Sequence, residues 1–380
     1  MDRRRFLHLS MIGSGALVLG PGFWRNAYAA PAEPGPSPYG PLSDWPDANG
    51  LLLPAGFSSR VIARTGQAVP GTGYVWHDNP DGGACFPTPE GGWVYTSNSE
   101  TLRGGASAVR FASDGSILDA YRILSDTFVN CAGGPTPWGT WLSCEEHDAG
   151  RVWECDPLSP SQGVACPALG TFAHEAVAVD PNGLRLYLTE DRPNGRFYRF
   201  TPSAWPSLAA GRLEAARFRS DPLAGGPVSW VKVSPLLPAS RQPSAFWTTA
   251  FNGGEGCWYD QGTVYFTTKG DNRVWAYSVE SSHLEVIYDD DLYPDSPLTG
   301  VDNVVVSRSG DLYVAEDGGD MRLCFITPER VVAPFLQVVG QEGSELTGPA
   351  FSPDGQRLYF SSQRGSDGQG LTYEVRGPFR

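Results

Sequence analysis

The stretch HEAVAVDPNGLRLYLTED, residues 174–191, decides the fold. Two apolar runs flank the turn sequence DPNG, a pattern typical of a β-hairpin. The second half of this stretch recurs as a turn, a short strand with one aromatic residue, and then polar or acidic residues. The six copies are TPEGGWVYTSNSE (88–100), TPWGTWLSCEE (136–146), DPNGLRLYLTED (180–191), DQGTVYFTTKGD (260–271), SRSGDLYVAEDG (307–318) and SPDGQRLYFSSQR (352–364).

The spacing of the copies predicts the architecture. Their aromatic residues lie 46, 46, 78, 48 and 46 residues apart, at Tyr95, Trp141, Tyr187, Tyr265, Tyr313 and Tyr359. A repeat of forty-odd residues built from strands and glycine turns is typical of propeller blades. We therefore predict an all-β, six-bladed β-propeller over residues 56–380, with an insertion in the third blade where the long step falls. Within that insertion, residues 207–216 are compatible with a short helix.

The N-terminal residues predict export. Arg3, Arg4 and Arg5 precede Phe6 and a mildly apolar stretch, and Ala-Tyr-Ala at 27–29 has the small-x-small pattern of a cleavage site. We predict a twin-arginine-type signal over residues 1–29, read by the twin-arginine export machinery, and a periplasmic or secreted mature protein. An ordinary secretory signal is the alternative. Residues 30–55 are rich in Pro and Gly and form a predicted lead-in.

Composition excludes several classes of function. The formal net charge is −14, and it becomes about −17 without residues 1–29, which argues against a nucleic-acid partner. Outside the signal no apolar run has the ~18 residues of a membrane helix, so no membrane anchor is expected.

The chain has seven cysteines, an odd number that leaves at least one unpaired in an oxidising compartment. Cys155 and Cys166 are candidates for a disulfide, and Cys131 and Cys144 are a second pair.

The predicted hairpins bring acidic residues together. Reading back 10–12 residues from each aromatic gives a second aligned position, occupied by Gly83, Cys131, Glu175, Glu255, Asp302 and Gly348. Because a hairpin returns to the end where it starts, Glu175 should lie near Asp191, and Cys131 near Glu146. If these hairpins contain the inner strands, all of these side chains meet at one mouth of the central channel.

Two interpretations of this convergence remain open. Carboxylates and a thiol cannot crowd together unless some are protonated or cations lie among them. Oxygen ligands suit Ca²⁺ or Mg²⁺, and a thiolate favours a transition metal, so one interpretation is a mixed metal centre. In the other, the acidic residues are structural and bond to the backbone of turns.

The motif NCAGGPTPWGTWLSCEE at 130–146 closely resembles a signature of the PhoX-type alkaline phosphatases. The resemblance continues in order through FAHEAVAV at 172–179, YLTEDR at 187–192, GGEG at 253–256 and VDN at 301–303. It implies a six-bladed propeller, twin-arginine export, and an active site that holds calcium and iron (Fe³⁺).

The same resemblance implies metal ligands in this chain. The Cys of NCAGG, which is the iron ligand of the family, corresponds to Cys131. The remaining implied ligands are Glu146, Glu175, Asp191, Glu255 and Asp302. Asn98 and Glu100 occupy the position equivalent to Glu146 in the first hairpin, and His174 precedes Glu175, so these three are secondary candidates.

One position departs from the family. Family members carry an arginine two residues before the glutamate of GGE, and this chain has Gly253 there. Arginine is the natural bidentate partner of phosphate. Lys269, Arg192 or Arg364, each of which follows a repeated aromatic, would have to supply the missing charge.

These observations favour an exported metal-dependent phosphoesterase that binds the phosphate of a small phosphoester at a Ca/Fe cluster in the channel mouth. Because Gly253 stands in place of the family arginine, a calcium-dependent, lactonase-like hydrolase on the same scaffold is the alternative. Fold alone does not fix chemistry. A propeller that binds metal without catalysis is the third possibility.

Overall fold

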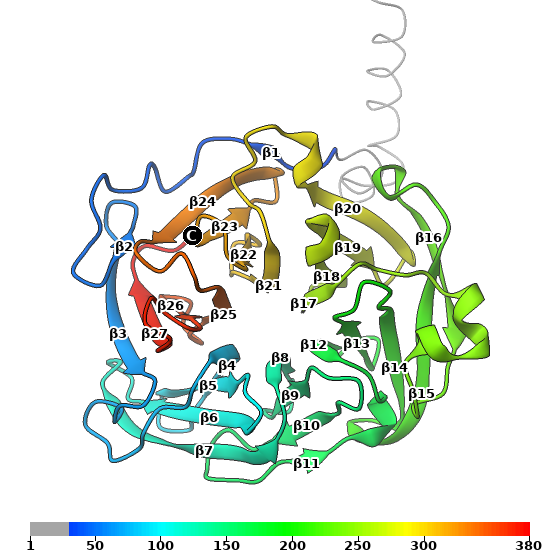
Figure 1. Cartoon of the computed structure of the whole chain (residues 1–380), viewed down its shortest axis with the longest axis horizontal. Helices are drawn as coiled ribbons and strands as arrows, with labels where there is room; N and C mark the ends of the chain where they lie inside the picture. The colour runs from blue at the N-terminus through cyan, green and yellow to red at the C-terminus, as the bar shows by residue number, and fades with distance from the viewer. Residues whose placement is uncertain (1–29) are drawn as a thin grey trace, which may run out of the picture.

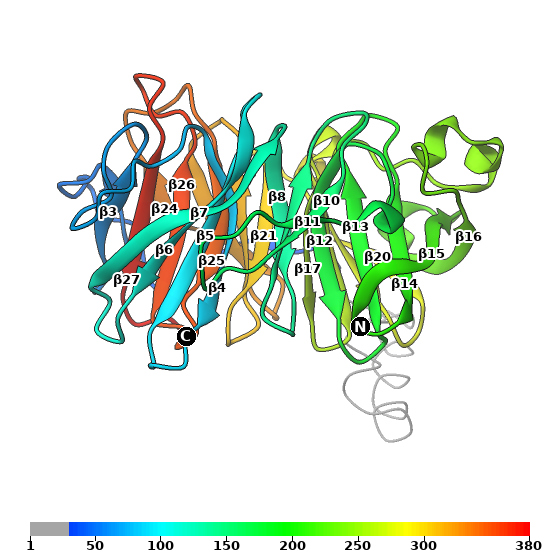
Figure 2. The ribbon, with the colours of Figure 1, turned by 90° about the horizontal axis from the view of Figure 1, so that it is seen from below.

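The computed structural model describes residues 30–380. In this range the regular elements are β-strands and short 3-10 helices, so the fold is all-β. The sheets stand side by side around a central axis, as in a β-propeller (Figure 1). Seen from the side, the strands near the centre run along this axis (Figure 2). The predicted signal at residues 1–29 lies outside the described residues.

The stretch that decides the fold forms the hairpin of β12 (His174–Asp180) and β13 (Arg185–Glu190). Its two strands pair antiparallel, with Ala178 opposite Tyr187. Alternate side chains of β13 enter different apolar clusters: Leu186 and Leu188 pack in one, and Tyr187 packs in another. Both faces of the sheet are therefore buried, as they must be in a sheet stacked between two neighbours.

Six such hairpins surround the axis. They are β4 (Pro80–Pro87) with β5 (Trp93–Ser99), β8 (Asn130–Pro135) with β9 (Trp141–Glu145), β12 with β13, β17 (Gly254–Asp260) with β18 (Thr263–Thr268), β21 (Val301–Val306) with β22 (Leu312–Glu316), and β25 (Leu346–Phe351) with β26 (Arg357–Ser362). The first strand of each hairpin contacts the first strand of the next, and β25 contacts β4. These six inner strands therefore form a closed ring.

Further strands extend the sheets outward. They are β6 (Gly104–Phe111), β7 (Ile117–Thr127), β10 (Val152–Cys155), β11 (Val164–Ala165), β14 (Phe197–Ala204), β15 (Ser207–Phe218), β16 (Gly226–Lys232), β19 (Arg273–Ser278), β20 (His283–Asp289), β23 (Arg322–Ile326), β24 (Val331–Val338) and β27 (Leu371–Arg376). The N-terminal strand β3 (Ser58–Arg64) pairs with β27, so the two ends of the domain complete one sheet. In the predicted lead-in, β1 (Glu33–Pro34) and β2 (Leu51–Leu52) add to β24.

In the long step between Tyr187 and Tyr265, the residues that are compatible with a short helix form a strand instead. Residues 207–216 lie in β15, so the predicted short helix is wrong. Pairing with β14 and β16 overrides the helix propensity of the Ala, Leu and Arg residues there. The strand β16 in turn meets β20 through two residue pairs, and this joint links β12–β16 and β17–β20 into a nine-stranded sheet among five sheets in all.

Short 3-10 helices occur between the strands. They are η1 (Pro167–Leu169), η2 (Pro222–Ala224), η3 (Ala239–Arg241), η4 (Pro243–Trp247), η5 (Lys269–Asp271) and η6 (Asp290–Leu292). Within residues 30–380 no helix is long and apolar enough to cross a membrane.

All seven cysteines are free thiols, so neither expected disulfide is present. Cys155 and Cys166 lie near each other in the chain, but their side chains pack in different apolar clusters. The thiol of Cys131 instead donates a hydrogen bond to Glu175 Oε1 at 3.3 Å, while Cys144 is buried in a core cluster.

Candidate metal centre

The inner strands share an irregularity near their first residues. In each inner hairpin the pairing register shifts within a few residues of the start, which marks a β-bulge. A bulge bends the strand and re-aims a side chain. The residues at the shifted position, which we call the bulge ring, are Asp81, Cys131, Glu175, Glu255, Asp302 and Gly348.

Glycine or alanine follows four of the six bulge-ring residues and lets the strands converge. An added Cβ at Gly82 would lie 2.4 Å from the Cα of Ala132, and one at Gly256 would lie 2.6 Å from the backbone nitrogen of Val304. Gly82, Ala132 and Gly256, together with Ala176 and Gly133, line a narrow cavity of about 30 Å³ beside the bulge ring. The close approach of the strands places the bulge-ring side chains around one axis.

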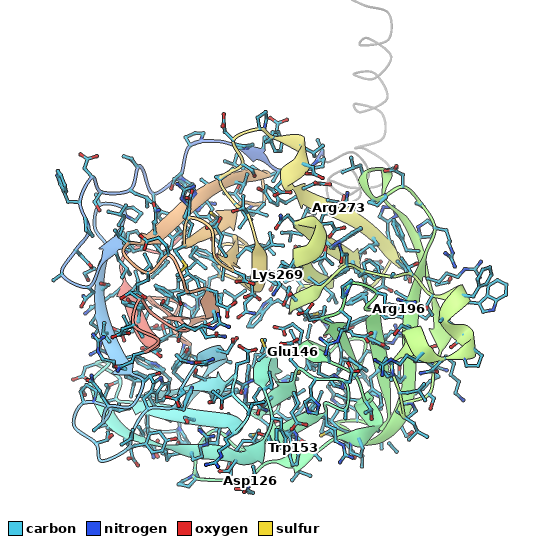
Figure 3. The ribbon with its side chains drawn as sticks, viewed as in Figure 1. Asp126, Glu146, Trp153, Arg196, Lys269 and Arg273 are labelled. Carbon is cyan, nitrogen blue, oxygen red and sulfur yellow. The ribbon has the colours of Figure 1, made fainter. Side chains whose placement is uncertain are left out.

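A second set of residues ends the same hairpins. The residue that directly follows the second strand is Glu100, Glu146, Asp191, Lys269, Asp317 or Gln363. We call this set the strand-end ring. Because each hairpin returns to its starting edge, the two rings share one mouth of the propeller. Figure 3 shows Glu146 and Lys269 near the centre of the ring of sheets.

The two rings bring candidate ligand atoms close together. Three groups have ligand atoms that all lie within 4.8 Å of one another: Glu100, Cys131 and Glu146; Asp81, Glu100 and Glu345; and Glu175, Glu255 and Asp302. Five of the six primary ligands predicted from sequence belong to these groups. The sixth, Asp191, belongs to the strand-end ring, where its charge raises the pKa of Glu146.

Burial and mutual repulsion set the protonation of the site. Burial raises the pKa of Glu146 to about 8, and the charges of Asp191 and Glu100 add to the effect. The pKa of Asp302 rises to about 7, chiefly through burial. Burial raises the pKa of Glu175 well above its ordinary value, and the neighbouring Glu255 and Asp302 raise it further. Without added cations these groups therefore favour their neutral forms.

The thiol is subject to the same forces. Burial raises the pKa of Cys131 well above that of a free cysteine, followed by the charges of Asp81 and Glu175. A protonated thiol is a poor metal ligand, so binding of a metal at Cys131 must release a proton.

Basic side chains approach the rings from the rim. Lys269 Nζ lies 3.0 Å from Glu255 Oε1 and 3.1 Å from Asp317 Oδ2. Arg192 Nη1 lies 3.5 Å from Glu146 Oε1, and Arg364 Nη1 lies 2.6 Å from Glu345 Oε1. All three basic residues expected to replace the family arginine therefore contact carboxylates of the site.

Hydrogen bonds from neighbouring hairpins hold the bulge ring. The Asn98 amide donates to the backbone oxygens of Cys131 at 3.1 Å and Ala132 at 2.7 Å. Its own oxygen accepts from the Trp141 indole at 2.9 Å. The hydroxyls of Thr189 and Thr267 donate to the backbone oxygens of Glu255 and Asp302. Asn98, a secondary candidate, thus has its amide engaged with the strand that carries Cys131.

The secondary candidates Glu100 and His174 have different surroundings. Glu100 belongs to two of the three ligand groups. His174 is buried and stacks on Phe172, with ring centroids 3.6 Å apart. Its Nε2 lies 3.2 Å from the backbone oxygen of Gly170, and burial lowers its pKa to about 3.

Sequence reasoning missed Asp81 and Glu345. The aligned position predicted for the first hairpin was Gly83, but the bulge places Asp81 there. The prediction was wrong because β4 has eight residues, which moves its start away from Tyr95. Glu345 directly precedes β25 and so lies outside the repeated positions. The sequence DGG after Pro80 gave a signal for Asp81, since a carboxylate before two glycines is compatible with a bulge.

The arrangement fits bound cations. Among the described residues, Glu175 Oε2 is buried and has no hydrogen-bond partner. The groups offer mainly carboxylate oxygens, which suit Ca²⁺, and one sulfur, which favours a transition metal. Glu100, Cys131 and Glu146 form the mixed group, whereas the other two groups are all carboxylate.

The comparisons with known proteins show the family of the chain. The family model described as alkaline phosphatase PhoX matches residues 94–151 and 146–286, about half of the chain. The chain belongs to the PhoX family. The matched range includes Cys131, Glu146, Glu175, Asp191 and Glu255 of the site.

Solved structures support the fold. *Pseudomonas fluorescens* PhoX in complex with vanadate, a transition state analogue, aligns with TM-score 0.73 and 16% identity over 92% of this chain and 98% of that one. The PQQ domain of pyranose dehydrogenase from *Coprinopsis cinerea* aligns with TM-score 0.52 and 10% identity over 87% of this chain and 98% of that one. At these identities the likeness concerns the fold alone. The curated protein sequences contain no significant match.

Proposed function

We propose that this PhoX-family protein is a metal-dependent phosphomonoesterase with its active site at the mouth shared by the two rings. The observation that carries the proposal is the convergence of three potential ligand groups on one axis in a chain of this family. Cys131, Glu146, Glu175, Asp191, Glu255 and Asp302 would hold calcium and iron, and Asp81, Glu100 and Glu345 would extend the ligand set.

Different residues would have different roles in such a reaction. Bound cations would hold the phosphate oxygens and stabilise the negative charge that develops on them. The buried carboxylates would fix the positions of these cations, and the hydrogen bonds from Asn98, Thr189 and Thr267 would keep the ligand strands in place. Rigid support of this kind keeps the stabilising charges preorganised.

Lys269 and Arg192 are the proposed phosphate contacts. An ammonium has three donors, and Lys269 directs its charge to Glu255 and Asp317 while its side chain stays 35% exposed. Arg192 is equally exposed and lies at the rim beside Glu146 and Asp148. Both can therefore be reached by a ligand that enters the mouth.

Activity on phosphomonoesters tests the proposal. Metal-replete protein should hydrolyse p-nitrophenyl phosphate and other small phosphomonoesters. Chelation should abolish turnover, and Glu255→Gln should lower kcat at least 100-fold while circular dichroism stays unchanged. A metal-replete, folded protein that is inert on the whole panel would contradict the assignment.

Gly253 favours a second candidate function. Its φ of +68° suits glycine, and an added Cβ would lie 3.3 Å from Asp191 Oδ1. The backbone here thus disfavours the arginine of the family, and with it the usual phosphate contact. A calcium-dependent lactonase on the same scaffold does not need that contact. Lactone hydrolysis with calcium alone, without phosphatase activity, would support this second function.

We infer that the nine-stranded sheet represents two blades, so that the propeller has six blades with an insertion in the third. The joint between β16 and β20 has two residue pairs, far fewer than the joints within either half. Residues 219–253, between β15 and β17, would be the insertion. An experimental structure should show six rotationally equivalent inner hairpins, and five would contradict the inference.

We also propose that residues 1–29 direct twin-arginine export to the periplasm or beyond, leaving one propeller domain behind the lead-in. The supporting feature is the pair Arg3 and Arg4 before Phe6 and Leu7. Replacing both arginines with lysine should leave unprocessed protein in the cytoplasm. Unchanged export of that variant would exclude the twin-arginine route.

A further inference from the structure

One position of the strand-end ring differs from the others in charge. In the other five hairpins the residue after the second strand is acidic or, at Gln363, an amide. After β18 it is Lys269. A single cation thus stands at a position where the repeat otherwise supplies an oxygen ligand.

The lysine lies among carboxylates of both rings. Its Nζ contacts Glu255 of the bulge ring and Asp317 of the strand-end ring at 3.0 and 3.1 Å. Glu255 and Asp302 are both almost fully buried. Burial raises the pKa of Asp302, and the positive charge of Lys269 acts in the opposite direction. A buried carboxylate needs a cation or a proton nearby.

The backbone fixes the lysine in this place. The backbone nitrogen of Lys269 donates to the oxygen of Gly253 at 2.8 Å, and that of Gly270 donates to Asn252 at 3.0 Å. An added Cβ at Gly270 would lie 2.4 Å from the Asn252 side chain, so the chain is tightly packed here. The 3-10 turn η5 therefore presents the side chain to the mouth from a constrained backbone.

We propose that the ammonium of Lys269 takes the place of one additional divalent cation, which an acidic residue at this position would otherwise help to bind beside Glu255 and Asp317. This inference rests on the proposed function, because it assumes that the three ligand groups of the mouth bind metal. A lysine carries one positive charge and donates hydrogen bonds, whereas Ca²⁺ requires six to eight oxygen ligands. The lysine would thus offset part of the negative charge at Glu255 and Asp317, and the centre would hold one fewer metal ion than its repeated positions allow.

Metal content per chain tests the proposal. The variant Lys269→Asp restores the acidic residue of the neighbouring hairpins and should bind one more divalent ion per chain than the wild type, measured by elemental analysis after equilibration with Ca²⁺. Lys232→Asp makes the same change of charge on β16, at an exposed position, and should leave the count unchanged. Equal counts in the wild type and Lys269→Asp would overturn the proposal.

A second variant covers the case in which Lys269→Asp does not fold. Lys269→Met removes the charge without adding a ligand. In EDTA its thermal midpoint should fall by about 5 °C or more relative to the wild type, and saturating Ca²⁺ should restore most of the loss. A midpoint in EDTA equal to that of the wild type would show that the ammonium neutralises nothing.

The outcomes separate this inference from the proposed function. A wild-type protein that binds no metal would contradict both. A wild-type protein that binds metal and has the same count as Lys269→Asp would contradict only the role of the lysine.

Discussion

At the scale of single residues, Glu175 shows what the site requires. One of its oxygens accepts a hydrogen bond from Cys131, and the other is buried without a partner. An ionised carboxylate in such a place is unfavourable unless a cation lies next to it. The side chain therefore costs stability in the metal-free protein and contributes stability in the metal-bound one.

The variant Glu175→Gln should separate these two effects. In EDTA at pH 9 it should raise the free energy of unfolding by about 1–2 kcal/mol, because an amide needs no counter-charge. In the metal-bound protein it should lower metal affinity at least tenfold. Thermal unfolding with EDTA and with Ca²⁺ measures both. If Glu175→Gln destabilises the metal-free protein, then Glu175 is structural.

Four residues show how much of the site can be predicted from sequence alone. Glu175 and Asp302 were predicted because hairpin geometry fixes where a strand starts relative to its aromatic residue. Asp81 was missed because its strand is longer, and the sequence DGG at 81–83 was the one local sign of a bulge there. Glu345 was missed because a loop, not the repeat, positions it.

At the scale of elements, the inner strands β17 and β21 are held by the hairpins that precede them. The Thr267 hydroxyl on β18 donates to the backbone oxygen of Asp302 on β21, and Thr189 on β13 does the same for Glu255 on β17. Such bonds join residues of two different hairpins, so no local sequence pattern predicts them. They transmit the position of one ligand strand to the next.

Removing one of these bonds should loosen a ligand. Thr267→Val keeps the shape of the side chain and should lower the free energy of unfolding by about 1 kcal/mol, because the buried Asp302 carbonyl loses a donor. It should also weaken metal binding. Thr201→Val is the matched control, since the Thr201 hydroxyl is buried and has no partner among the described residues, and it should lower neither quantity. Equal effects of the two variants in denaturant titrations would contradict the account.

The strands and hairpins were predicted correctly from sequence where the pattern repeats. The prediction failed where no repeat guides it. All six repeated copies form the hairpins expected of them. Residues 207–216 form a strand because β14 and β16 pair with them, a tertiary effect that composition does not reveal. Cys155 and Cys166 are close in sequence, but their side chains pack in different apolar clusters, and the spacing of two cysteines does not reveal this.

At the scale of the whole molecule, the centre couples folding to pH. Burial gives Glu146, Asp302 and Glu345 pKa values of about 8, 7 and 9, above those of an unfolded chain. The folded, metal-free protein therefore binds more protons at these groups than the unfolded one. Their contribution to stability is fully present below about pH 4 and is lost as pH rises to about 9.

Metal should reverse much of this dependence. In EDTA the thermal midpoint should fall steadily from pH 5 to pH 9, and the increase produced by Ca²⁺ should grow over the same range because ionised carboxylates bind the ion. Calorimetric scans at matched ionic strength measure both trends. A metal-free midpoint that rises with pH would show that the carboxylates are already compensated by the protein.

The most direct test of the central claim is elemental analysis of protein purified from its own export route without chelators, alongside Cys131→Ala. The account predicts calcium and iron in the wild type, and loss of iron with retention of calcium in the variant. A folded wild-type protein without bound metal would contradict it, and the two rings of the mouth would then be purely structural.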